Sequence, residues 1–271
     1  MSDSAAPKRI TLREIARKKR DGEKLVVVTA YDVLFAKVVD ASGVDIVLVG
    51  DSVGNVVAGL DSTLPVKLEQ MIYHGAAVRR GIKHALLVVD MPFLSYQASV
   101  ERAILNAGRL LQETGADAVK LEGGSKEMVA TVAALIRTGI PVMAHLGFTP
   151  QSVRTIGMRI QGRERGDADR LIEEAIALED AGAFAIVLEL LPTDVAKQIT
   201  AAVTIPTIGI GAGPHCDGQV LVLPDLLGLN DGFEPKFLKK YADLAGVARD
   251  AVQKYADEVR SGTYPDASHS N

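Results

Sequence analysis

Short, unbroken runs of aliphatic residues recur along this 271-residue chain, and a segment with helical spacing follows nearly every one. Runs of this kind, rich in Val and Ile, suit parallel strands that are covered on both faces. The predicted strands are the run from Val44 into Asp51 and residues 25–29, 85–90, 118–122, 141–146, 184–189, 206–211 and 219–223. Eight strands alternating with helices favour a (β/α)8 TIM barrel over an open doubly wound sheet.

Three predicted helices end in the same way, with a glycine between small residues just before a strand. These glycines are Gly43, Gly115 and Gly182, and a glycine past a helix end turns the chain back toward the sheet. The helix that ends at Gly43 has Leu34, Val38 and Val39 on one face, and further helices are predicted over residues 11–19, 68–80, 100–111, 126–137, 169–180 and 193–200.

The end of the chain predicts one longer helix, from Pro235 to about Arg260. Its apolar stripe of Phe237, Tyr241, Leu244 and Ala248 would cap the barrel or form a subunit contact. Barrels of this class commonly occupy such a length as one domain, and no repeat or low-complexity linker divides the sequence. We therefore expect a single domain over residues 1–271, with frayed ends at 1–8 and 266–271.

Composition excludes several classes of protein. Hydrophobic residues make up 48% of the chain and aromatic residues only 4%, so Val, Leu, Ile and Ala must build the core. A net charge of −4 gives no broad attraction to nucleic acid or to anionic membranes. Cys216 is the only cysteine, and the sequence shows neither a signal peptide nor a membrane-spanning run. These features predict a cytoplasmic protein that acts on small molecules.

Charged side chains stand at or near the carboxyl ends of the predicted strands, which meet at one mouth of a barrel. Asp51, Asp90 and Glu122 close three consecutive strands, and such hard oxygen ligands favour Mg²⁺ or a similar divalent ion. Taken singly, Asp51 or Asp90 is explained as well by a helix cap or a turn. The sequence has no HxH, HExxH or CxxC spacing, which argues against a zinc site of the usual kind.

Lys120 and Glu122 are two residues apart on one strand and so share a face, away from Val119 and Leu121. Charges that face a barrel interior need partners. The two side chains could pair with each other, or Glu122 could approach a metal while Lys120 binds a substrate carboxylate or enolate oxygen. A Schiff-base lysine is a third reading.

Three further features have open interpretations. Glu189, among leucines, suits a general base or acid, or caps the helix from Thr193. His145 either orients a substrate oxygen or is a core imidazole. The connection 147–167 carries four arginines and is either a solvated loop or a mobile lid for an anionic ligand. The glycines of GIGAG at 209–213 permit a close approach to a ligand or make a tight turn.

Beyond these single features, long blocks of the chain resemble the ketopantoate hydroxymethyltransferase family. The blocks are TAYD at 29–32, VGDSVGN at 49–55, DSTLPV at 61–66, VVDMPF at 88–93, VKLEGG at 119–124, HLGFTPQSV at 145–153 and GIGAGPHCDGQVLVLPDLLG at 209–228. They occur in order and cover most of the chain, which makes the resemblance far more specific than any single motif.

The resemblance implies a barrel of the phosphoenolpyruvate/pyruvate type. It also implies transfer of a hydroxymethyl group from 5,10-methylenetetrahydrofolate to 3-methyl-2-oxobutanoate, giving 2-dehydropantoate for pantothenate and coenzyme A synthesis. By matching position, one Mg²⁺ per subunit would be held by Asp51, Asp90 and Glu122, with Glu122 acting through water. The oxo acid would contact Asp51, Ser52, Asp90 and Lys120, and Glu189 would accept the proton. The family further implies a homo-oligomer, commonly a decamer.

The sequence departs from the family pattern at two places, which bear on pocket shape. Asn55 stands where methionine is usual, and Leu190 and Leu191 follow Glu189 where Cys-Val or similar is common. The closest rival function is a metal-dependent lyase or aldolase of the same superfamily that acts on another 2-oxo acid without tetrahydrofolate. A barrel that had become a non-enzymatic binding protein would have lost the ligands, and all are present.

Overall fold

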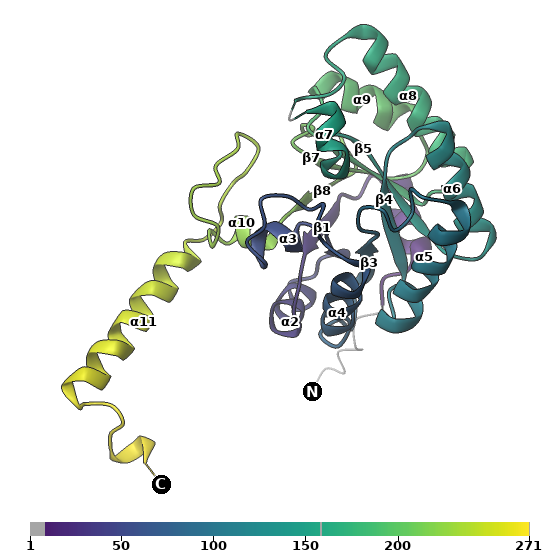
Figure 1. Ribbon diagram of the computed structural model, residues 1–271. Coiled ribbons are helices and arrows are strands. Elements are labelled where there is room, and N and C mark those ends of the chain that lie inside the picture. Colours follow the sequence, from purple (N-terminus) through teal and green to yellow (C-terminus); the bar gives the residue numbers. More distant parts are fainter. Residues whose placement is uncertain (1–8, 158, 271) are drawn as a thin grey trace, which may run out of the picture. The chain divides into compact units, whose positions relative to one another are not determined.

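The computed structural model describes residues 9–157 and 159–270, so the predicted frayed end at 1–8 lies outside the described residues. Its centre is a closed barrel of parallel strands in chain order, with β8 pairing back to β1 (Figure 1). The strands are β1 Leu25–Thr29, β2 Ile46–Val49, β3 Leu86–Asp90, β4 Ala118–Glu122, β5 Val142–Gly147, β6 Ala185–Glu189, β7 Thr207–Ile210 and β8 Gly218–Leu221. The predicted (β/α)8 barrel is therefore confirmed.

Helices surround the barrel as the alternating pattern predicts (Figure 1). They are α2 Val33–Ala41, α4 Leu68–Arg79, α5 Val100–Thr114, α6 Lys126–Arg137, α8 Arg165–Asp180 and α9 Thr193–Ala202, with the short helices α3 Val53–Val56 and α7 Val153–Ile156 in the connections. The predicted glycine turns are present, since Gly43, Gly115 and Gly182 have φ angles of 77°, 73° and 98°. Only glycine adopts this left-handed region at little cost, so these residues fix where the chain turns back to the sheet.

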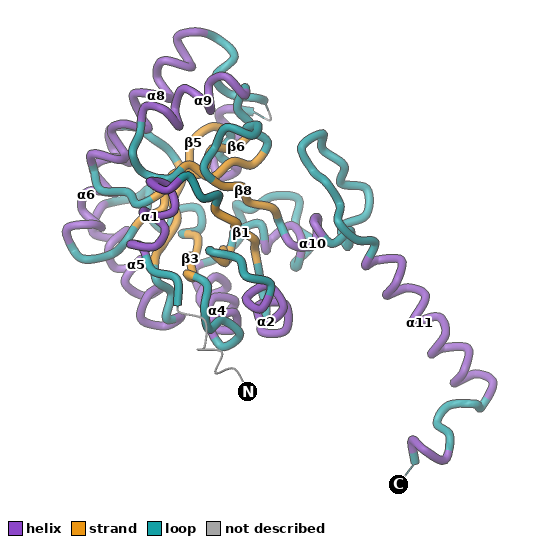
Figure 2. Tube along the Cα trace, turned by 180° about the vertical axis from the view of Figure 1, so that it is seen from behind, coloured by secondary structure: helices purple, strands orange, loops and turns teal. Residues whose placement is uncertain are grey.

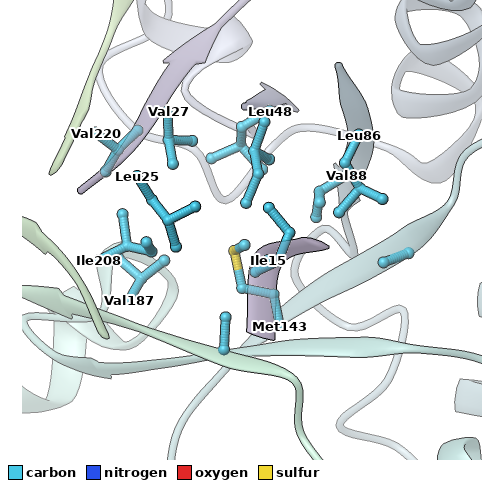
Figure 3. Packing of buried hydrophobic residues seen from close by; sticks show 13 residues of the cluster. Ile15, Leu25, Val27, Leu48, Leu86, Val88, Met143, Val187, Ile208 and Val220 are labelled. Carbon is cyan, nitrogen blue, oxygen red and sulfur yellow. The ribbon is translucent and has the colours of Figure 1, made fainter. Parts of the chain in front are cut away.

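The barrel interior is filled by alternate residues of the strands (Figure 3). Its inward-facing apolar residues are Leu25, Val27, Ile46, Leu48, Leu86, Val88, Ala118, Met143, Ala185, Val187, Ile208 and Val220. Helix α1, Leu12–Asp21, lies across one end of the barrel (Figure 2) and buries Ile15 in this cluster. Because strand side chains alternate, the next inward positions on β3 to β6 are Asp90, Lys120, Glu122, His145 and Glu189.

The chain divides into two compact units, of which the first ends at Val222 and the second is Leu223–Asn271. The second unit contains α10 Leu223–Leu226, α11 Leu244–Ser261 and a 3-10 turn, Ala267–His269, capped by Asp266. The single domain predicted over 1–271 stays a prediction. Among the described residues, no helix has both the length and the apolar character that crossing a membrane requires.

The predicted start of the last helix at Pro235 is wrong, because α11 begins only at Leu244. The Asp243 side chain accepts a hydrogen bond from the Gly246 N–H and so caps the helix there. The backbone N–H of Tyr241 bonds to the Leu226 carbonyl, which draws the preceding segment to α10. Phe237 and Tyr241 therefore lie outside the helix and do not form the predicted stripe.

A buried carboxylate joins α2 to the segment that leads into β3. Asp40 is 6% exposed and accepts hydrogen bonds from the backbone N–H groups of Lys83, His84 and Ala85 at 2.9, 3.0 and 2.8 Å. Burial raises the pKa of Asp40, but these N–H donors outweigh burial and hold the pKa below its usual value.

Replacing Asp40 by asparagine is expected to lower the free energy of unfolding by about 2 kcal/mol at pH 7, since hydrogen bonds to a charged acceptor are lost. A depressed pKa stabilises the fold above the unfolded-state pKa of about 3.9, and this contribution is lost as pH falls through the folded pKa. Urea unfolding at several pH values measures the difference. The difference in unfolding free energy between the parent and Asp40→Asn should shrink below about pH 4. The exposed Asp250→Asn control should show no such difference. A difference that stays constant down to about pH 3 would contradict the role of Asp40.

Candidate active site

The strand register brings the predicted charged residues together at the carboxyl ends of the strands. Asp90 pairs with Lys120 between β3 and β4, and Glu122 pairs with His145 between β4 and β5. Gly147 pairs with Glu189 between β5 and β6. All the charged side chains except that of Glu189 are at least nine-tenths buried. The mouth of the barrel therefore carries a continuous arc of ionisable groups above the apolar core.

Asp90 is held from two sides within this arc. Its Oδ2 accepts a hydrogen bond from the Asp51 backbone N–H at 3.0 Å, and its Oδ1 lies 2.9 Å from Lys120 Nζ. Burial lowers the pKa of Lys120, but the negative charges of Asp90, Glu122 and Asp51 outweigh burial and raise it. Lys120 is therefore a charged ammonium, which argues against the Schiff-base reading because that chemistry needs a free amine.

Asp51 follows β2 and lies near two other carboxylates, those of Asp90 and Glu122. Its Oδ2 accepts a hydrogen bond from Gln151 Nε2 at 3.0 Å, and its side chain is buried. Burial, and then the charges of Asp90 and Glu122, raise the pKa of Asp51 to about 7. The mouth therefore holds more negative charge than its own cations balance.

His145 links two glutamates of the arc. Its Nδ1 lies 3.5 Å from Glu122 Oε1, and its Nε2 lies 3.3 Å from Glu189 Oε2. Burial and the charge of Lys120 lower the pKa of His145, but Glu122 and Glu189 outweigh them and raise it to about 9. The sequence left this residue open between substrate contact and core imidazole. The structure places the imidazole between two carboxylates, which favour its charged form.

Ser52 lies at the start of α3 with its hydroxyl toward Tyr31, whose Oη is 2.8 Å from Ser52 Oγ. Gly50, two residues earlier, leaves room for this hydroxyl, because a Cβ there would lie 2.7 Å from Ser52 Oγ. The turn therefore places a half-buried hydroxyl next to Asp51.

The two departures from the family pattern differ in their surroundings. Asn55 is exposed, and its Nδ2 donates to the Leu60 carbonyl at 2.8 Å. Leu190 directly follows Glu189 and has a φ of 48°, a left-handed conformation that is costly for leucine. A hydrogen bond from its N–H to the Ile210 carbonyl, at 2.9 Å, holds this turn beside the site.

Loop residues complete the site, and sequence reasoning did not identify them. Gln151 contacts Asp51 and Glu122, Tyr96 contacts Gln151, and Tyr31 contacts Ser52. The only signal was that Gln151 and Tyr31 lie inside the HLGFTPQSV and TAYD blocks. The arginines of the same connection that can be described, Arg154, Arg159 and Arg163, are exposed.

The carboxylates at the barrel mouth are possible ligands of a metal ion. In the described part of the chain, no three or more His, Cys, Asp or Glu side chains form a group that could hold a metal ion by themselves. Mg²⁺ does not need such a cage, since it usually keeps several waters and binds one or two carboxylates together with substrate oxygens. Asp51 and Asp90 fit that requirement, and a cation there would offset the charges of Asp90 and Glu122 that act on Asp51.

Comparison with known proteins gives a full-length match. A family model described as ketopantoate hydroxymethyltransferase matches residues 9–267. Two relatives named 3-methyl-2-oxobutanoate hydroxymethyltransferase come from Moorella thermoacetica and Chloroflexus aggregans. The first is 55% identical over 97% of this chain and 97% of the relative. The second is 52% identical over 97% of this chain and 94% of the relative.

Solved structures with the same fold are far more distant in sequence. One is 2,3-dimethylmalate lyase, described as a PEP mutase/isocitrate lyase superfamily member, with a TM-score of 0.60 and 15% identity over 96% of this chain and 91% of the other. Another is a phosphonopyruvate hydrolase complex with oxalate and Mg²⁺, with a TM-score of 0.60 and 13% identity over 96% and 93%. At such identities the likeness shows the barrel fold alone.

Proposed function

The chain belongs to the ketopantoate hydroxymethyltransferase family, and from this premise we propose that it forms 2-dehydropantoate from 3-methyl-2-oxobutanoate, with 5,10-methylenetetrahydrofolate as the one-carbon donor and Mg²⁺ as the metal. The resemblance seen in the sequence blocks and the prediction of a hydroxymethyltransferase enzyme are confirmed. The substrate pair, the metal and the residue roles belong to the proposal.

The arrangement that carries the proposal is the buried arc of carboxylates around Lys120, with Glu189 at its more open end. A hydrogen on C3 of a 2-oxo acid becomes acidic only where positive charge meets the developing enolate oxygen and a base faces the carbon. When bound by Asp51 and Asp90, with Glu122 acting through water, Mg²⁺ would supply a Lewis acid for that oxygen.

The chain's own residues then have separate roles. The Lys120 ammonium and the Ser52 hydroxyl bind the oxygens of the oxo acid, and the fixed charge of Lys120 stabilises the enolate as it develops. Glu189 takes the C3 proton through a carboxylate oxygen. His145 Nε2, 3.3 Å from Glu189 Oε2, holds that carboxylate in place. The enolate carbon then bonds to the one-carbon unit, and the two C–N bonds that join this unit to the folate break. Overall, water supplies the hydroxyl group, while the C3 proton and the second water proton go to the two folate nitrogens, so that tetrahydrofolate leaves.

The main alternative is a metal-dependent lyase or aldolase of the same superfamily that acts on another 2-oxo acid. The family match over residues 9–267 favours the transferase. The test is proton NMR and mass spectrometry of 3-methyl-2-oxobutanoate incubated with the enzyme, Mg²⁺ and the folate donor. A hydroxymethyl product that needs both Mg²⁺ and the donor is expected. If folded, Mg²⁺-loaded protein forms no product, the proposal is contradicted and the lyase or aldolase alternative is favoured.

Two further properties are proposed with this function. The single cysteine supports a cytoplasmic enzyme, and the family resemblance supports a homo-oligomer, commonly a decamer.

A further inference from the structure

Gln151 is the one glutamine whose carboxamide reaches the carboxylates of the active site within the described residues. It is 5% exposed and belongs to the 3-10 turn Pro150–Ser152, which follows β5. Its Nε2 donates to Asp51 Oδ2 and to the Met91 carbonyl, each at 3.0 Å. Its Oε1 accepts from Tyr96 Oη at 2.7 Å and from Gln97 Nε2 at 3.0 Å. Both donors and both acceptor positions of the carboxamide are therefore used.

The backbone of the same residue reaches a second carboxylate. The Gln151 N–H donates to Glu122 Oε2 at 3.0 Å. One residue thus ties together the side chains that follow β2 and end β4. The other Glu122 oxygen, Oε1, faces His145, and no described residue donates a hydrogen bond to Asp51 Oδ1. Gln151 occupies one oxygen of each carboxylate and leaves the second for another partner.

Tyr96 and Gln97 together fix the orientation of the carboxamide, since both donate to its oxygen. The Tyr96 hydroxyl accepts a hydrogen bond from the Glu122 N–H at 3.1 Å, so it has its own proton to give to Gln151 Oε1. A reversed amide would place its oxygen against the Asp51 carboxylate and the Met91 carbonyl, and these are all acceptors. In this orientation Asp51 Oδ2 meets an N–H donor.

A neutral amide suits this position for an electrostatic reason. It fixes the direction of two carboxylates without neutralising them, whereas a lysine or arginine there would compete with a metal cation. We propose that Gln151 is a positioning residue that orients Asp51 and Glu122 for the divalent ion, an inference that rests on the proposed function of the site. The metal site then depends on the β5–α8 connection as well as on the strand ends.

The test measures Mn²⁺ binding by electron paramagnetic resonance in the absence of substrate, with the purified full-length enzyme. Gln151→Met keeps the size of the side chain and removes its hydrogen bonds. Tyr96→Phe leaves Gln151 in place and removes one of the two hydrogen bonds that orient its amide oxygen. Gln161→Met is the matched control, because Gln161 is 6% exposed in the same connection and, among the described residues, its side chain donates to the Arg159 carbonyl alone, at 3.2 Å.

We expect Gln151→Met to raise the Mn²⁺ dissociation constant roughly 10–100-fold, Tyr96→Phe to raise it about threefold or more, and Gln161→Met to leave it within about twofold. Thermal unfolding of each variant separates this effect from a loss of fold. Parental affinity in both Gln151→Met and Tyr96→Phe would overturn the inference. If Gln151→Met does not fold, a parental Mn²⁺ affinity in Tyr96→Phe is enough to overturn the inference.

The same experiments distinguish a failure of the proposed reaction from a failure of the role of Gln151. A parent enzyme that binds Mn²⁺, responds to these substitutions and yet makes no hydroxymethyl product contradicts the proposed reaction and supports the role of Gln151. A parent enzyme that binds no Mn²⁺ or Mg²⁺ overturns the role of Gln151 itself.

Discussion

Replacing Glu189 by glutamine is expected to slow the exchange of the C3 proton of 3-methyl-2-oxobutanoate by roughly 10²–10⁴-fold, the usual contribution of a positioned general base. The amide has nearly the same shape but cannot accept the proton. Glu189 is not among the proposed metal ligands, and its contact with His145 is on the side of Nε2. Affinity for Mg²⁺, measured by calorimetry, should therefore remain at the parental value.

Glu174→Gln on α8 is the matched control for this substitution. The side chain of Glu174 is 17% exposed and that of Glu189 is 18% exposed, but Glu174 pairs with Arg170 on the outer helix. It should exchange the proton at the parental rate. Normal exchange in Glu189→Gln, followed by proton NMR in D₂O, would remove Glu189 from the role of base.

Asp90→Asn is expected to weaken Mg²⁺ binding by more than the roughly 10–100-fold that the loss of an outer partner costs, because a direct ligand charge disappears. Binding of the oxo acid should weaken as well. Asp90 is the group nearest to Lys120, at 2.9 Å, and its loss leaves that ammonium without its closest counter-charge. Calorimetric titration with Mg²⁺, and then with the oxo acid, measures both effects.

The control for this experiment is a buried aspartate outside the barrel mouth. Asp225 is 6% exposed, compared with 2% for Asp90, and its Oδ1 accepts from Asn230 Nδ2 at 2.8 Å. Asp225→Asn should bind Mg²⁺ like the parent. Equal Mg²⁺ affinity in Asp90→Asn and the parent would show that Asp90 is no ligand.

The barrel could be predicted because its determinants are local. Aliphatic runs define the strands, and Gly43, Gly115 and Gly182 define where three helices turn back, as the positive φ angles show. The last helix was placed wrongly because its boundary depends on contacts. Asp243 caps α11 at Leu244, and the hydrogen bond from Tyr241 to Leu226 withdraws the preceding residues from the helix.

The site residues on strands could likewise be predicted from local pattern, whereas those on loops could not. Strand alternation alone predicts that Lys120, Glu122 and Glu189 face one mouth, since the inward direction repeats every second residue. No periodicity governs the loops, so the inward turn of Gln151 and its bond to Tyr96 could not be predicted. The sequence left Lys120 with several possible partners, and only the register shows that it faces Asp90 across two neighbouring strands.

The central claim is that this barrel mouth removes the C3 proton of 3-methyl-2-oxobutanoate with the help of a divalent ion. The most direct measurement is proton NMR of that acid in D₂O with the purified enzyme, without any folate donor, in the presence of Mg²⁺ or of EDTA. We predict that the C3 signal disappears with Mg²⁺ and persists with EDTA. A C3 signal that persists with folded, Mg²⁺-loaded enzyme would contradict the account.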